Sequence, residues 1–150
     1  MKKSVTALVV CFFLIGIMVS SGNASSKEEA KAMVEKAIAF YKANGKEKTF
    51  AEVNNTKGKF TKGDLYVFVY DMTGTVHAHG ANLKMIGKDL SDIKDPDGKS
   101  FVKERIELAK TKGKGWQDYK FTNPVTKKVE QKTAWIEKVD EFIFGCGAYK

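Results

Sequence analysis

Apolar and polar positions in the last third of the chain follow a pattern that predicts three consecutive β-strands. The strands are expected at residues 116–121, 131–136 and 142–149, which are rich in aromatic and β-branched side chains. Asn123-Pro124 separates the first two, because proline donates no ladder hydrogen bond, and Asp140-Glu141 separates the last two. Connections this short join antiparallel neighbours. We therefore predict an antiparallel sheet in this part of the chain.

Two further strands are predicted upstream of these. Residues 65–72 are apolar at nearly every position, which favours a central strand, and residues 75–79 follow a Thr-Gly turn as its partner. Alternation places three aromatic residues on one face of the central strand and three aliphatic residues on the other. The aromatic set is Tyr66, Phe68 and Tyr70; the aliphatic set is Leu65, Val67 and Val69. One face must meet a helix, and the aromatic face could line a cavity.

Helical periodicity marks the rest of the ordered chain. Ser26 and Glu29 have the spacing of a capping box, and apolar residues then recur every three or four positions as far as Asn44-Gly45. A short helix is predicted at residues 50–54 and a second clear helix at residues 100–112. The predicted fold class is α+β of PAS-like type: a five-stranded antiparallel sheet, a long N-terminal helix, and further helices packed on the same face. The irregular residues 81–99 are expected to form a long loop with short helical turns over the sheet, a common kind of binding element.

The first 24 residues have the features of a secretory signal. Lys2-Lys3 precedes the apolar residues 5–19, and the small residues Gly22 and Ala24 lie three and one before the expected cut. We predict a cleaved signal at 1–24, a single domain at 25–150, and a periplasmic or secreted protein. An uncleaved membrane anchor is the alternative, although its apolar run falls short of the ~20 residues that usually span a bilayer.

The charge of the chain narrows the range of partners. The net charge is +8, and cleavage of Lys2 and Lys3 would leave +6. This charge would attract anionic ligands, although a solvated lysine coat explains it as well. Arg105 is the only arginine, which argues against nucleic acid as a partner, because nucleic-acid readers rely on bidentate arginine contacts. After cleavage Cys146 is the only cysteine, so no intramolecular disulfide or cysteine-based metal cluster is expected.

The residues show little sign of catalysis or metal binding. His77 and His79 are the only histidines and are predicted to share one strand face, a spacing seen in zinc sites. Acidic side chains would have to complete such a site, so we predict no cofactor and keep a metal site as an alternative. No nucleophile set, phosphate loop or paired-carboxylate motif stands out, and we predict that the chain is not an enzyme.

The order of motifs across residues 27–149 resembles the single Cache domains of type 2. The matching segments are residues 70–79, 83–90, 97–98, 115–116, 119–121, 123–124, Lys132 and 145–149. The resemblance implies an extracytoplasmic, PAS-related sensor fold that binds small organic molecules, often short carboxylates. Gly80, Trp135, Phe142 and Phe144 depart from the family pattern and could reshape the pocket.

The candidate site combines charge and aromatic surface. His79 and Lys132 match the family's histidine and lysine positions and are predicted to hold a ligand carboxylate, whereas His77 is predicted to be structural. The predicted aromatic wall consists of Tyr66, Phe68, Tyr70, Trp116, Tyr119 and Trp135.

Three functions are compatible with these features. The first is an exported domain that binds a small organic anion and is read by a separate membrane-bound sensor or receptor, because the sequence ends one residue after the matching region. The second is a structural or interaction domain whose pocket is filled by its own side chains, Trp135 and Phe144 among them, and which forms a homodimer through the first helix. The third, an exported metal-binding or enzymatic protein, rests on the two histidines alone.

Overall fold

The computed structural model describes residues 25–150, so the predicted signal at 1–24 lies outside the described residues. The helices are α1 (Lys27–Asn44), α2 (Lys46–Asn54), the 3-10 turn η1 (Leu83–Met85) and α3 (Phe101–Thr111). The strands are β1 (Thr61–Lys62), β2 (Leu65–Tyr66), β3 (Phe68–Asp71), β4 (Val76–His79), β5 (Lys114–Thr122), β6 (Val129–Val139) and β7 (Phe142–Tyr149). In the described part of the chain no helix is long and apolar enough to cross a bilayer.

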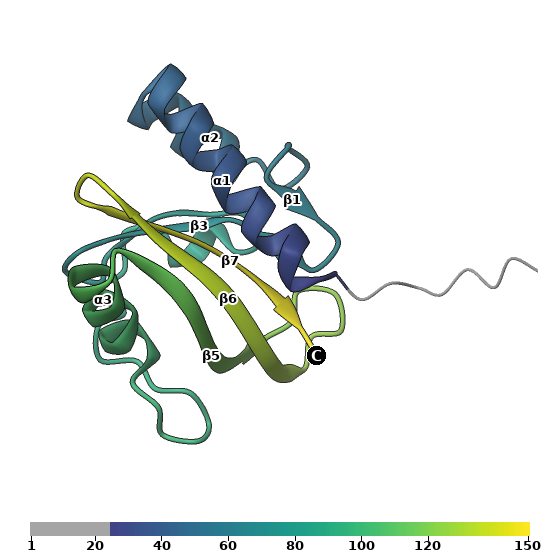
Figure 1. Cartoon of the computed structure of the whole chain (residues 1–150). Helices are drawn as coiled ribbons and strands as arrows, with labels where there is room; N and C mark the ends of the chain where they lie inside the picture. Colours follow the sequence, from purple (N-terminus) through teal and green to yellow (C-terminus); the bar gives the residue numbers. More distant parts are fainter. Residues whose placement is uncertain (1–24) are drawn as a thin grey trace, which may run out of the picture.

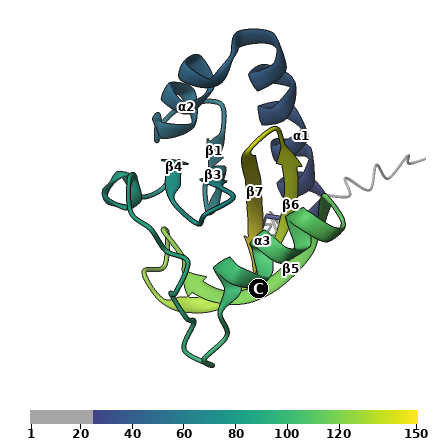
Figure 2. The same ribbon diagram turned by 90° about the vertical axis from the view of Figure 1, so that its left-hand side faces the viewer.

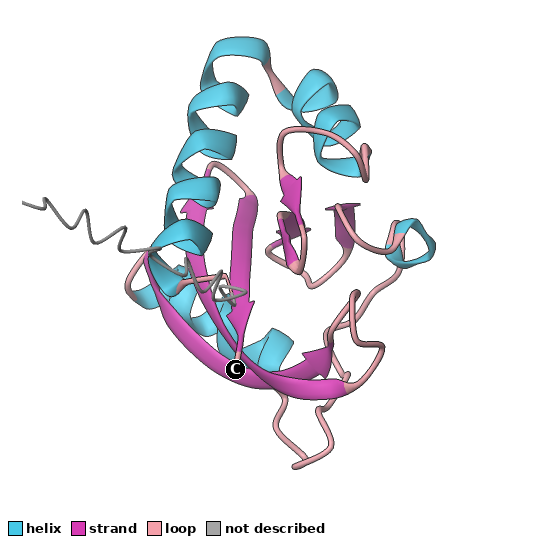
Figure 3. Cartoon of the chain, turned by 90° about the vertical axis from the view of Figure 1, so that its right-hand side faces the viewer, coloured by secondary structure: helices cyan, strands magenta, loops and turns pink. Residues whose placement is uncertain are grey.

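A five-stranded antiparallel sheet forms the centre of the domain (Figure 1). Its strand order is β4-β3-β7-β6-β5, so the C-terminal strand β7 lies between β3 and β6. The predicted α+β architecture is thereby confirmed. One difference is that Leu65 and Tyr66 leave the main sheet and pair with Thr61 and Lys62 in a separate two-stranded sheet. The long β5-β6 hairpin curls under the domain (Figure 3).

Helices cover both faces of the sheet, which corrects the expectation that they pack on one face (Figures 1 and 2). Val34 and Ala37 of α1 pack with Val67 and Val69, whereas Phe101 of α3 packs with the aromatic side of β3. The cause is the alternation in β3 itself. Both of its faces are apolar, so each must be covered.

The ends of the helices follow local sequence signals. Ser26 Oγ accepts from Glu29 N at 3.1 Å, and Glu29 Oε2 accepts from Ser26 N at 2.9 Å, so the predicted capping box is present. Gly45 has a φ of 82°, a conformation that suits glycine, and it ends α1 while beginning α2. Helix α2 therefore starts four residues earlier than predicted, at Lys46.

A β-bulge separates the two histidines, which were expected to share a face. Val69 pairs with Ala78, but Tyr70 pairs with Val76, so β4 has one extra residue opposite β3. Such a bulge reverses the alternation of side chains. His77 consequently lies against Phe142 on the α1 side, while His79 lies against Tyr66 and Phe68 on the α3 side.

Candidate ligand-binding site

A cavity of about 400 Å³ lies on the α3 side of the sheet, at the end where β5 turns into β6. Segment 81–99 contributes one wall and the β5-β6 connection contributes another. The residues lining it are Tyr66, His79, Ala81, Asn82, Met85, Ile93, Phe121, Thr122, Pro124 and Lys127. Two of the residues proposed from sequence, Tyr66 and His79, thus line this cavity.

Lys132 lies directly behind the cavity wall and is fully buried. Its Nζ is 3.9 Å from the ring centroid of Tyr66 and 4.8 Å from that of Tyr149, and it has no hydrogen-bond partner. Burial disfavours the charged form and, with a contribution from Arg105, lowers the pKa of Lys132 to about 7. The aromatic faces compensate only partly for the lost water. The ammonium therefore lacks an anion.

His79 is buried with its two ring nitrogens in different roles. Nδ1 accepts from the backbone amides of Ala81 at 3.3 Å and Asn82 at 3.0 Å. Two amide donors require an unprotonated Nδ1, so the proton of the neutral ring is on Nε2. Burial, together with Lys132 and Arg105, lowers the pKa of His79 to about 3, which keeps the ring neutral. His79 thus holds the start of segment 81–99 and offers one N–H donor.

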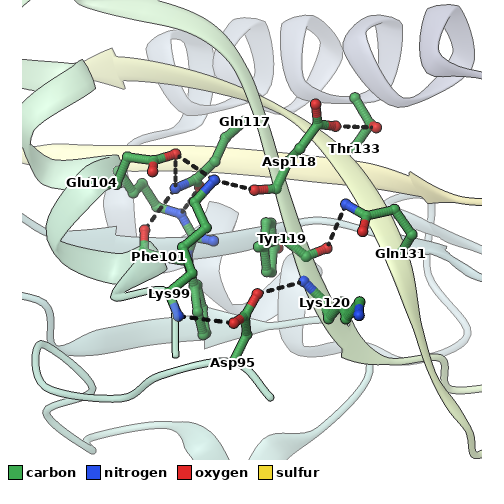
Figure 4. Close-up of polar contacts among 11 residues, drawn as sticks. Asp95, Lys99, Phe101, Glu104, Gln117, Asp118, Tyr119, Lys120, Gln131 and Thr133 are labelled. Carbon is green, nitrogen blue, oxygen red and sulfur yellow. Dashed lines mark hydrogen bonds and ion pairs between the residues drawn. The ribbon is translucent and has the colours of Figure 1, made fainter. Parts of the chain in front are cut away.

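Asp95 holds the other end of this segment (Figure 4). Its Oδ1 accepts from the amides of Asp97 and Lys99, both at 3.0 Å, and its Oδ2 accepts from the amide of Lys120 in β5 at 3.1 Å. The expected turn is present, since Gly98 N donates to Asp95 O at 2.9 Å. The cavity cover is therefore anchored to the sheet at both ends.

The hydroxyl groups near Lys132 already bond to one another. Tyr149 donates to the carbonyl oxygen of Thr122 at 2.8 Å, so it must accept from the hydroxyl of Tyr66 at 3.1 Å. The Tyr66 hydroxyl is therefore committed as a donor and keeps only acceptor capacity. The donors left for an incoming anion come from nitrogen atoms.

Arg105 is a second buried cation, which the sequence interpretation did not include in the site. It is 1% exposed, and its guanidinium lies 4.5 Å from the ring of Phe68 and 4.9 Å from that of Tyr70. Its Nε donates to Gln117 Oε1 at 3.2 Å, while Nη2 has no partner. The sequence did indicate that Arg105 is buried, because it follows Val102 by three positions and precedes Ala109 by four, on the apolar face of its helix.

The remaining predicted aromatic residues fall into two groups. Phe68, Tyr70 and Tyr119 are buried around Arg105, behind the cavity. Trp116 and Trp135 pair across β5 and β6 on the α1 side, under Lys27 and Lys31. These tryptophans do not reach the cavity, because Trp135 is an odd number of residues from Lys132 along the same strand.

His77 takes no part in the cavity. Its Nε2 is 2.8 Å from Asp71 Oδ2, and the ring packs on Phe142. Among residues 25–150, no three side chains of histidine, cysteine, aspartate or glutamate are grouped as they would be around a metal ion.

Comparison with known proteins gives relatives among sensor proteins. The sensor histidine kinase MctS of Rhizobium johnstonii and the methyl-accepting chemotaxis protein McpP of Pseudomonas putida are each 33% identical over 88 residues, or 57% of this chain. The matched region is 19% of MctS and 16% of McpP, so the chain spans less than a fifth of either relative.

Solved structures share the fold. A methyl-accepting chemotaxis protein from Vibrio parahaemolyticus has a TM-score of 0.70 at 24% identity, covering 82% of this chain and 87% of its own. A periplasmic sensor domain of a chemotaxis protein has a TM-score of 0.63 at 22% identity, covering 81% and 88%. A Cache chemosensory domain whose structure explains its recognition of carboxylic acid has a TM-score of 0.62 at 26% identity, covering 81% and 86%.

A family-level match agrees with these likenesses. The profile of the family Single Cache domain 2 matches residues 15–149, which is most of the chain and begins within the predicted signal. The resemblance inferred from the order of motifs is thereby confirmed. This chain belongs to the Single Cache domain 2 family of sensor domains.

Proposed function

We propose that the domain binds a small organic anion, a short carboxylate, in the cavity in front of Lys132. The observation that carries this proposal is the ammonium of Lys132, which is fully buried and has no hydrogen-bond partner. A buried charge costs several kcal/mol unless an opposite charge accompanies it. A carboxylate entering the adjacent cavity would supply that charge where the low dielectric strengthens the attraction.

The surroundings of the cavity suit an acid with a small apolar body. The Nε2–H of His79 can donate to a second carboxylate oxygen, and Met85, Ile93 and Phe121 offer apolar contacts. Recognition of carboxylic acid by the Cache domain that shares this fold at 26% identity supports the same class of ligand.

The place of the domain in the cell and its partner belong to the same proposal. The predicted signal and the likeness to a periplasmic sensor domain favour the periplasm or the cell exterior. The relatives are a histidine kinase and a chemoreceptor, so we infer that a membrane-bound sensor or receptor reads the bound state.

The alternative of a self-filled pocket has less support. Trp135 and Phe144, the bulky residues that suggested it, both pack in the core on the α1 side. They leave the cavity on the opposite side open. A homodimer through the first helix stays a prediction.

A thermal-shift screen with matched pairs tests the proposal. Acetate is compared with acetamide and propionate with propionamide, since each pair differs in charge far more than in shape. A bound acid at a hundredfold excess over Kd stabilises the fold by about 2.7 kcal/mol. We expect stabilisation by an acid and none by its amide. Equal shifts with both members, or no shift with any acid in protein shown by mass spectrometry to be ligand-free, would overturn the proposal.

A further inference from the structure

We propose that the ligand is a two-ended acid, a short dicarboxylate, with one carboxylate at Lys132 and His79 and the other at Arg105. This inference rests on the proposed function and makes it more specific. It assigns Arg105 as the residue that distinguishes dicarboxylates from monocarboxylates.

The positions of the two cations beside the aromatic rings of β2 and β3 support a ligand of this length. Lys132 Nζ is 3.9 Å from the ring of Tyr66 and 5.5 Å from that of Phe68. The guanidinium of Arg105 lies 4.5 Å from Phe68 and 4.9 Å from Tyr70. Because both cations are this close to the ring of Phe68, Lys132 Nζ and Arg105 Cζ are no more than about 10 Å apart. This spacing suits the two ends of a short diacid.

Two negative groups would be needed to balance the buried cations Lys132 and Arg105. Neither cation takes part in any ion pair among residues 25–150, and each has a buried nitrogen without a partner. A monocarboxylate would pair with one of them and leave the other unpaired in a dry interior. A dicarboxylate can pair with both, which removes the cost of each buried charge.

The surroundings of Arg105 hold it in place without neutralising it. Gln117 accepts from Arg105 Nε. The Nε2 of Gln117 donates to Phe101 O at 2.7 Å and to Glu104 Oε1 at 3.2 Å (Figure 4). The carboxylate of Glu104 meets Lys99 at 3.0 Å rather than Arg105. The guanidinium is thus oriented by a neutral amide, and its Nη2 stays available for an anion.

Access to Arg105 requires aromatic side chains to move. Tyr66 and Phe121 line the cavity in front of Lys132, and the ring of Phe68 is close to both cations, 5.5 Å from Lys132 Nζ and 4.5 Å from the guanidinium of Arg105. Rotation of such rings is a local motion, and the pairing of two buried charges offsets its cost.

Isothermal titration of the purified protein with matched acids tests the inference. Succinate is compared with butyrate and malonate with propionate, because each pair has equal chain length and differs by one carboxylate. We expect the better dicarboxylate to bind at least about tenfold more tightly than its partner. Equal or weaker binding of both dicarboxylates would overturn this inference while leaving the proposed function intact. Binding of none of the four acids would count against both.

Variants of Arg105 assign the second carboxylate. Arg105→Met should bring the affinities for succinate and butyrate together while butyrate still binds, and Arg105→Lys should restore part of the preference. A dicarboxylate preference that persists in a folded Arg105→Met variant would overturn the role of Arg105. Should Arg105→Met fail to fold, the matched acids on the unmodified protein still decide the ligand class.

Discussion

Gly147 leaves the space that the side chain of Lys132 occupies. A Cβ on Gly147 would lie 2.6 Å from Lys132 Cε and 2.9 Å from both Lys132 Cγ and Ala134 Cβ, closer than packed atoms approach. The two residues are on neighbouring strands, β7 and β6, and on the same face of the sheet. The absence of a side chain in β7 therefore sets the path of the lysine toward the cavity.

Gly147→Ala should displace Lys132 and weaken anion binding. Ala134 cannot move without shifting β6, so the lysine must give way, and we expect a destabilisation of roughly 1–3 kcal/mol. Cys146→Ala is the matched control, because Cys146 faces α1, with its Sγ 3.9 Å from Met33 Sδ. Calorimetry of both variants with the acid found in the screen makes the comparison. Unchanged affinity in Gly147→Ala would mean that this path is not needed for binding.

Two substitutions at His79 separate its two roles. Asparagine keeps an acceptor near the position of Nδ1, and glutamine places an amide near that of Nε2. We expect His79→Asn to hold the amides of Ala81 and Asn82 but to lose about tenfold in anion affinity. His79→Gln should keep most of the anion affinity but no longer hold the amides of Ala81 and Asn82, which should therefore exchange hydrogen faster. Unchanged anion affinity in His79→Asn would indicate that His79 acts only as an anchor for the amides of Ala81 and Asn82.

The pKa of Lys132 predicts opposite effects of pH on stability and binding. The unfolded chain keeps this proton up to its ordinary pKa of 10.5, whereas the unliganded fold releases it above about 7. Because the unfolded state then binds more protons, the stability of the unliganded protein should rise from pH 7. Burial raises the pKa of Cys146 from 9.0 to about 12, which acts in the opposite direction above pH 9.

Anion affinity should fall over the same window from pH 7 to 9, approaching about tenfold per pH unit as Lys132 loses its charge. Chemical denaturation and calorimetry at several pH values measure the two trends. The Lys132→Met variant should show neither trend. Affinity that stays constant from pH 7 to 9 would contradict a charged Lys132 as the anion's partner.

Local patterns were sufficient to predict most of the fold. The strands at residues 116–121, 131–136 and 142–149 became β5, β6 and β7, because alternation and turn residues are encoded within a few positions. The capping box at Ser26 is local in the same sense. The expectation that the helices pack on one face was wrong, since the side on which each helix packs depends on contacts between distant segments.

The candidate site was harder to predict than the fold. The bulge that separates His77 from His79 depends on the pairing of β4 with β3, and nothing in the run of residues indicates it. Trp135 was included in the predicted aromatic wall for its aromatic ring, although its odd spacing from Lys132 on β6 places the two on opposite faces. Arg105 was missed because a single arginine on an amphipathic helix usually reaches solvent, whereas this one is enclosed by aromatic rings.

Lys132→Met, compared with the unmodified protein, measures the importance of the unpaired ammonium most directly. Lys138→Met, at an exposed position of the same strand, is the matched control. We predict that the free energy of unfolding of unliganded Lys132→Met rises by roughly 1–4 kcal/mol, because a buried unpaired charge is removed. We also predict that this variant no longer responds to the acid that stabilises the unmodified protein, whereas Lys138→Met behaves like the unmodified protein in both measurements. A Lys132→Met protein that the acid stabilises as strongly as the unmodified protein would contradict an anion site at Lys132.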